Sequence, residues 1–82
     1  MPRAMDGVAD GLHAHVVELD AAIIELVRRR TEICAQLAAR RRAAGVPAIE
    51  LARENAVLRR YGEALGRPGV PLAMCLTELG RR

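Results

Sequence analysis

The sequence predicts an all-α fold with three helices per protomer, one long, one medium and one short, and with the long helix paired in a dimer. Three observations support this prediction. Apolar residues recur every three or four positions through the first half of the chain, glycine and proline gather in two short segments, and no stretch alternates as a strand does. We expect the 82 residues to form a single domain.

The long helix is expected over about residues 8–44, which contain no proline, with residues 1–7 frayed. Its inward positions are separated alternately by four and three residues, as in a coiled coil. These positions, called here the heptad stripe, are Leu12, Val16, Leu19, Ile23, Leu26, Arg30, Ile33 and Leu37. Such a helix is about 50 Å long. Because the rest of this short chain cannot cover that length, we expect a homodimer.

Two breaks define the remaining helices. Gly45 suits the position just after a helix end, and Pro47 cannot continue the hydrogen-bond ladder. A second helix is therefore expected over about residues 49–65. The segment "GRPGVP" at 66–71 is predicted to be a turn, and a third helix is expected over about 72–80.

Composition excludes several classes of function. The net charge is +3, all thirteen basic residues are arginine, and Tyr61 is the one aromatic residue, so a stacking platform for single-stranded nucleic acid is absent. No apolar run is long enough to span a membrane, and no signal pattern begins the chain, which predicts a cytoplasmic protein without membrane contact. Cys34 and Cys75 lack ligand partners at metal-binding spacing, so we expect reduced thiols, no metal and no cofactor.

The segment "ELVRRRTEICAQLAARRR" at residues 25–42 contains two arginine triplets, which helical periodicity divides. Successive residues of a helix are rotated by about 100°, so a triplet cannot share one face. Arg30 lies on the heptad stripe, and Arg41 lies one step of four beyond Leu37. The remaining arginines are expected in solvent or at a rim: Arg28, Arg29, Arg40 and Arg42.

An inward arginine needs an anionic partner, because an unpaired buried charge costs several kcal/mol. For Arg30, one interpretation is a salt bridge that fixes the helix register, with Asp20 or Glu54 as partner. The other interpretation is a pocket that binds an anion. Arg53 likewise permits two interpretations, an ordinary i,i+3 ion pair with Glu50 or membership of the same pocket. Together with Arg41, these arginines would suit a small dianion with two carboxylates.

The segment "LHAHVVELDAAIIELVRRRTEICAQLAARRRAAGVPAIELARENAVLRRY" resembles the all-helical chorismate mutases. The similarity extends over about residues 12–80, and the tail resembles the short form of the family, which ends in a Leu-Gly-Arg stretch. The positions that fall into the family's register are Leu12-His13, Leu19-Asp20, Arg30, Arg41, Pro47 and Arg53-Glu54. The resemblance implies an intertwined homodimer with two active sites and the rearrangement of chorismate to prephenate, without metal or cofactor.

The resemblance also implies roles for individual residues. Arg30 would bind a carboxylate, Arg41 would reach the ether oxygen and a carboxylate, and Arg53 would orient the other end of the dianion. Glu50 and Glu54 would lie near the ring hydroxyl.

Two departures from the family pattern accompany this resemblance. His13 stands where the family usually has arginine, on the arm that would complete the partner's site, and the loss of a full charge there could cost about 1.5–3 kcal/mol. The chain also ends at Arg82, where longer relatives add polar groups to the site. The short relatives gain activity in complex with DAHP synthase, and Arg81 and Arg82 would be candidates for that contact.

Four other functions stay open on the sequence. The same arginines would serve an isochorismate pyruvate lyase or a 4-amino-4-deoxychorismate mutase. A catalytically idle regulatory dimer of the same fold is a further alternative, because of His13. A nucleic-acid binder would rest on the two arginine triplets, but ten acidic residues are interspersed and no helix-turn-helix spacing is present.

Overall fold

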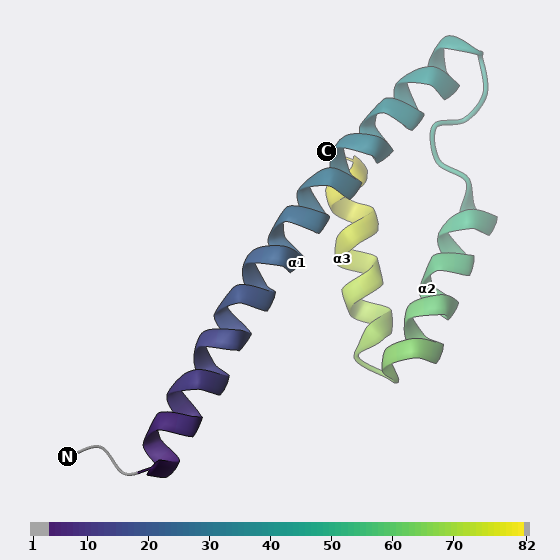
Figure 1. Cartoon of the computed structure of the whole chain (residues 1–82). Coiled ribbons are helices and arrows are strands. Elements are labelled where there is room, and N and C mark those ends of the chain that lie inside the picture. Colours follow the sequence, from purple (N-terminus) through teal and green to yellow (C-terminus); the bar gives the residue numbers. More distant parts are fainter. Residues whose placement is uncertain (1–3, 82) are drawn as a thin grey trace.

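The computed structural model describes the backbone of residues 4–81 and the side chains of residues 9–81, and it confirms the all-α prediction. Three helices follow one another, α1 (Ala4–Ala43), α2 (Leu51–Leu65) and α3 (Gly69–Arg81), with no strand in the part described. The molecule is elongated, with extents of 66 × 24 × 14 Å (Figure 1). None of these helices combines the length and the apolar character needed to cross a bilayer.

Helix α1 begins at Ala4, earlier than the expected residue 8, so four of the seven residues expected to be frayed are helical. The expectation for residues 1–3 lies outside the described residues. The helix ends at Ala43, close to the expected residue 44, and Gly45 follows the helix end as predicted, with a φ of +75° that glycine adopts without strain. The N–H of Val46 donates to the carbonyl of Arg41 at 3.0 Å, and that of Gly45 donates to Arg42 at 3.0 Å. This pair of bonds is the Schellman end of a helix.

The two shorter helices differ from expectation at their starts. Helix α2 begins at Leu51 rather than 49, and Glu50 precedes it in an extended conformation. Helix α3 begins at Gly69 rather than 72, inside the predicted turn. Pro71 does not prevent this, because the first turn of a helix leaves its N–H groups unpaired in any case.

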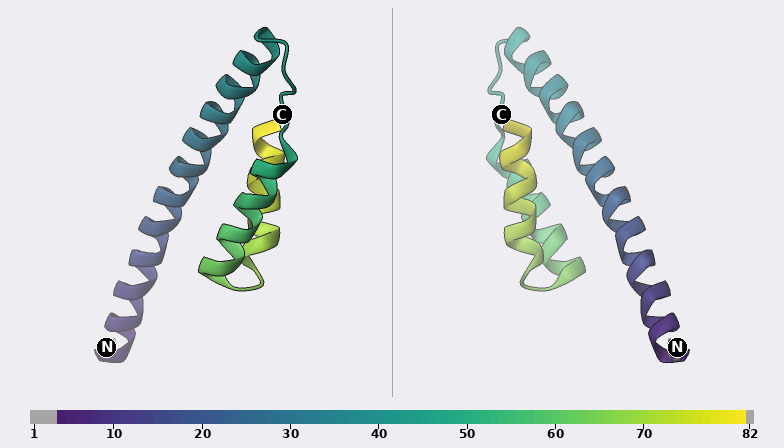
Figure 2. Two further views of the ribbon diagram at one scale, coloured as in Figure 1. Left: turned by 90° about the vertical axis from the view of Figure 1, so that its right-hand side faces the viewer. Right: turned by 90° about the vertical axis from the view of Figure 1, so that its left-hand side faces the viewer.

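Helix α3 packs against both other helices, whereas α2 and α1 do not pack directly on each other. Figure 2 shows the N-terminal half of α1 extending away from the α2–α3 pair. Ala73 is fully buried and Leu76 is 8% exposed, and these two side chains of α3 are the buried apolar core of the described residues. A chain with so small a core leaves most of its apolar surface in solvent.

The heptad stripe lies outside this small core. Its apolar members are between 45% and 62% exposed, from Leu37 to Leu12 and Ile33. The face of α1 that α3 partly covers is the adjacent one, which includes Val27, Cys34 and Ala38. The apolar stripe is therefore available to a second molecule, and the predicted pairing of the long helix stays a prediction.

Candidate active site

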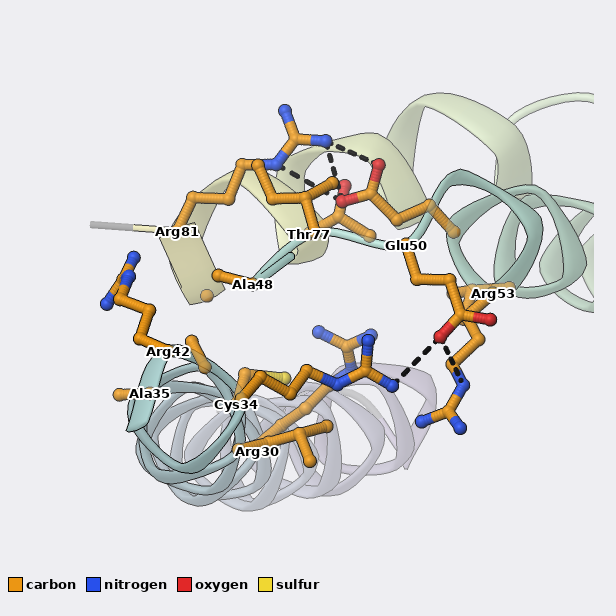
Figure 3. Close-up of a pocket in the computed structure, with 16 residues that line it drawn as sticks. Arg30, Cys34, Ala35, Arg42, Ala48, Glu50, Arg53, Thr77 and Arg81 are labelled. Atoms are coloured by element: carbon orange, nitrogen blue, oxygen red, sulfur yellow. Dashed lines mark hydrogen bonds and ion pairs between the residues drawn. The ribbon is translucent and has the colours of Figure 1, made fainter. Parts of the chain in front are cut away.

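A cavity of about 350 Å³ lies between the C-terminal half of α1, the start of α2 and the end of α3 (Figure 3). The apolar residues that line it include Leu37, Ile49 and Val57. The charged side chains around it are Arg30, Arg41, Arg42, Glu50, Arg53, Glu54 and Arg81. Because α1, α2 and α3 each supply part of this set, the cavity exists only when all three helices are in place.

The periodicity argument for the arginine triplets is confirmed. Arg30 and Arg41 are partly buried at the cavity, eleven positions apart on one side of α1. The four arginines expected in solvent or at a rim are exposed: Arg28, Arg29, Arg40 and Arg42. Arg42 also lines the cavity, which makes it a rim residue.

Glu50 connects two of the predicted arginines. Nη2 of Arg41 donates to Oε2 of Glu50 at 2.9 Å, and the same oxygen lies 3.1 Å from Nε of Arg53 (Figure 3). The side chain of Arg41 is 16% exposed, while those of Glu50 and Arg53 are 45% and 65% exposed. The i,i+3 ion pair predicted as one interpretation of Arg53 is thus present, although Glu50 lies just before α2 rather than within it, and Arg53 also lines the cavity. The two interpretations are compatible.

Arg30 has a different partner from those considered on the sequence. Its Nη1 donates to the backbone carbonyl of Leu76 at 3.2 Å, which ties α1 to the core of α3. Neither Asp20 nor Glu54 forms a salt bridge with it; the carboxylate of Glu54 pairs with Arg81 instead. The carbonyl carries no formal charge, so this contact alone does not neutralise the guanidinium of Arg30.

The contact between Arg81 and Glu54 was missed in the sequence reasoning. Nε and Nη2 of Arg81 donate to Oε1 of Glu54 at 3.2 and 2.6 Å, and Nη2 also contacts Oε2. The hydrogen bond to Glu54, and then its negative charge, raise the pKa of Arg81. The two residues are 27 positions apart and on different helices, so no periodicity in the sequence signals the pair. A residue expected to contact a partner enzyme is here part of the cavity wall.

His13 is the one predicted site residue that the cavity of this chain does not include. It is exposed in the N-terminal half of α1. Seventeen residues separate it from Arg30, which corresponds to about 25 Å along a helix. If His13 contributes to a site of this kind, that site belongs to another chain.

The charges of the cavity suit a small dianion. Its five arginines and two glutamates carry a formal charge of +3. Guanidinium groups bind carboxylates through two parallel hydrogen bonds, which fixes orientation as well as affinity. Within residues 9–81, no group of three or more His, Cys, Asp or Glu side chains is arranged to hold a metal ion. The arrangement therefore favours binding and orientation of a dicarboxylate.

Two comparisons with known proteins agree with this chemistry. The family model described as chorismate mutase type II matches residues 12–75. The chain is 42% identical over 83 residues to an intracellular chorismate mutase of Mycolicibacterium smegmatis, with 99% of this chain and 80% of the relative covered. It is 40% identical over 72 residues to the intracellular chorismate mutases of Mycobacterium bovis and Mycobacterium tuberculosis, with 88% of this chain and 68% of each relative covered.

Proposed function

The chain belongs to the chorismate mutase type II family, and we propose that its arginine-lined cavity binds chorismate and rearranges it to prephenate. The observation that carries the proposal is the convergence of Arg30, Arg41 and Arg53 on one cavity with a positive formal charge. Chorismate has two carboxylates, one on its ring and one on its enolpyruvyl arm. A volume of about 350 Å³ is within the range of pockets that hold small ligands.

The reaction makes few chemical demands on the protein. A carbon–carbon bond forms within the substrate as its ether carbon–oxygen bond breaks, without a nucleophile or an external proton. The protein must hold the flexible arm over the ring, which converts an improbable conformer into the bound one. It must also stabilise the negative charge that develops on the ether oxygen. Fixed guanidinium groups do both.

We assign the arginines by position. Arg30 and Arg53 bind the two carboxylates. Arg41 reaches the ether oxygen and one carboxylate, and its 16% exposure gives it the driest environment among the arginines paired with glutamate. A partly desolvated charge interacts more strongly than one in water. This difference in burial supports Arg41 as the group that acts on the transition state.

The glutamates have two functions in this proposal. Glu50 occupies Arg41 and Arg53 when the cavity is empty, and the substrate carboxylates replace it. The side chain of Glu50 is about half exposed, so its ion pairs with Arg41 and Arg53 contribute little to stability. Replacement of Glu50 by the substrate carboxylates therefore costs little free energy. Glu54, with Glu50, accepts the hydrogen bond of the ring hydroxyl.

We propose further that the active species is an intertwined homodimer. The accessible surface is 6963 Å², whereas a compact monomer of 8.9 kDa exposes about 4,800 Å². An excess of about 2,200 Å² per chain is what an obligate dimer of this size buries. The exposed heptad stripe supplies an apolar contact surface, and dimerisation would bring the partner's copy of the N-terminal arm, with His13, to the cavity.

A cytoplasmic location and an activating partner complete the proposal. The relatives named above are intracellular by name. DAHP synthase is the proposed partner, because the short family form gains activity with it. If the cognate synthase formed no complex on a sizing column and left kcat/KM unchanged, this part of the proposal would be wrong.

The deciding experiment is an assay of substrate depletion. The purified protein is incubated separately with chorismate, isochorismate and 4-amino-4-deoxychorismate, and the products are identified by their absorption spectra and masses. We expect prephenate from chorismate. Release of pyruvate from isochorismate, or turnover of the amino compound alone, would replace the proposal with one of the related reactions. No turnover of any substrate, with activity gained in His13→Arg, would indicate a catalytically idle dimer.

A further inference from the structure

We propose that Arg81 is a positioning residue that orients the carboxylate of Glu54 for the ring hydroxyl of the substrate. This inference rests on the proposed function, because it assumes that Glu54 contacts the substrate. It assigns a role at the cavity to the last turn of α3.

The geometry of the pair is that of a held carboxylate. Two nitrogens of Arg81 donate to the carboxylate of Glu54. Nε and Nη2 lie 3.2 and 2.6 Å from Oε1, and Nη2 also contacts Oε2. A guanidinium that uses two adjacent nitrogens sets the rotation of the carboxylate as well as its position. The carboxylate offers about four lone-pair directions, and these contacts leave at least one for a hydroxyl donor.

Helix packing places Arg81 accurately. The preceding residue, Gly80, lies so close to α1 that an added Cβ would be 2.9 Å from Cβ of Cys34. Only a residue without a side chain permits this approach, so the end of α3 has a defined distance from α1. Arg81 therefore extends from a packed helix end. Glu54, 23% exposed, is the more buried member of the pair, and Arg81 is 46% exposed.

The cavity gives Glu54 other partners if Arg81 is removed. Arg30 and Arg41 line the same cavity and carry the charges intended for the substrate. A Glu54 carboxylate released from Arg81 would be attracted to them and would compete with the substrate carboxylates. Arg81 thus serves binding in two ways, since it directs Glu54 toward the hydroxyl and keeps it away from the arginine clamps.

This role predicts a particular pattern of kinetics. The ring hydroxyl is present equally in the substrate and in the transition state, so its contact with Glu54 contributes uniform binding. We expect Arg81→Ala to raise KM about tenfold and to change kcat by less than about twofold. Arg81→Lys keeps the charge but has one point contact instead of a fork, so it should recover part of the loss.

The experiment measures kcat and KM for chorismate in wild type, Arg81→Ala, Arg81→Lys, Glu54→Gln and the double variant Glu54→Gln/Arg81→Ala. In the Glu54→Gln background, removal of Arg81 should change KM by less than about twofold, because the group that it positions is gone. The matched control is Arg59→Ala, which removes an exposed arginine of α2 that does not line the cavity.

Three results would overturn the inference. They are an unchanged KM in Arg81→Ala, an equal effect of Arg81→Ala in both backgrounds, and a loss of kcat and thermal stability with KM preserved, which would indicate a structural role alone. The proposed function has its own test, since wild type must convert chorismate to prephenate. Wild-type turnover combined with any of these three results defeats the role of Arg81 while the proposed function stands.

Discussion

Replacement of Arg41 by alanine separates the contribution of this residue to the fold from its contribution to the reaction. In the structure the side chain of Arg41 is 16% exposed, and its guanidinium forms an ion pair with Glu50, whose side chain is 45% exposed. An ion pair with a partly exposed member is worth about 0.2–1 kcal/mol. The interaction of the Arg41 charge with the helix dipole at the C-terminal end of α1 adds about 0.3–1 kcal/mol. Alanine is a good helix former, which offsets part of this loss. We therefore expect the free energy of unfolding to fall by less than about 1.5 kcal/mol.

The expected effect on the reaction is larger. Removal of one preorganised donor from a developing oxyanion costs about 2.7–4 kcal/mol in other enzymes, or about 10²–10³ in kcat. Arg41→Ala should therefore lower kcat by about that factor, while circular dichroism and thermal melting remain close to wild type. The assay is the initial rate of chorismate depletion under saturating conditions, together with a melting curve of each variant.

Arg40→Ala is the matched control, because Arg40 lies in the same last turn of α1, is exposed and does not line the cavity. It should lose a similar stabilising interaction with the helix end but retain nearly full activity. Equal kcat values for Arg40→Ala and Arg41→Ala would refute the division of the arginine triplets by helical face. So would an Arg41→Ala variant that retains more than about a third of wild-type kcat.

Three further predictions concern the dimer, the helix packing and the N-terminal arm. Ile23→Asp places a charge on a residue of the heptad stripe that is 56% exposed in the single chain. Burial of this charge in a dimer interface is unfavourable, so the variant should sediment as a monomer and lose turnover. A variant that still sediments as a dimer would contradict the assignment of the heptad stripe to the dimer interface. Gly80→Ala brings a Cβ to 2.9 Å from that of Cys34 and should lower the free energy of unfolding by about 1–3 kcal/mol. Gly11→Ala, where an added Cβ meets nothing within 4 Å, should raise the free energy of unfolding by about 0.5–1 kcal/mol. Melting curves of the two variants test this difference. His13→Arg places a permanent positive charge on the N-terminal arm of α1 and should raise kcat/KM for chorismate about tenfold or more. An unchanged kcat/KM would show that this position does not reach the substrate.

The local features of the fold could be predicted from the sequence. The long helix, its termination just before Gly45 and the inward direction of Arg30 and Arg41 all follow from interactions within a few residues along one chain. Helical periodicity, the left-handed conformation of glycine and the missing N–H of proline act over that range. The starts of α2 and α3 were displaced by two or three residues, because helix termini depend on small local differences in free energy.

The sequence by itself thus determined three helices, an unusually long apolar stripe and two arginines on one face. Only the tertiary structure decided which groups meet. The bond from Arg30 to Leu76 joins residues 46 positions apart, and the Arg81–Glu54 pair joins residues 27 apart. Both contacts depend on how α3 crosses the other helices, which the chain reversal at Gly66 and the close approach at Gly80 establish. Those distances result from packing in three dimensions, and no period along one helix encodes them.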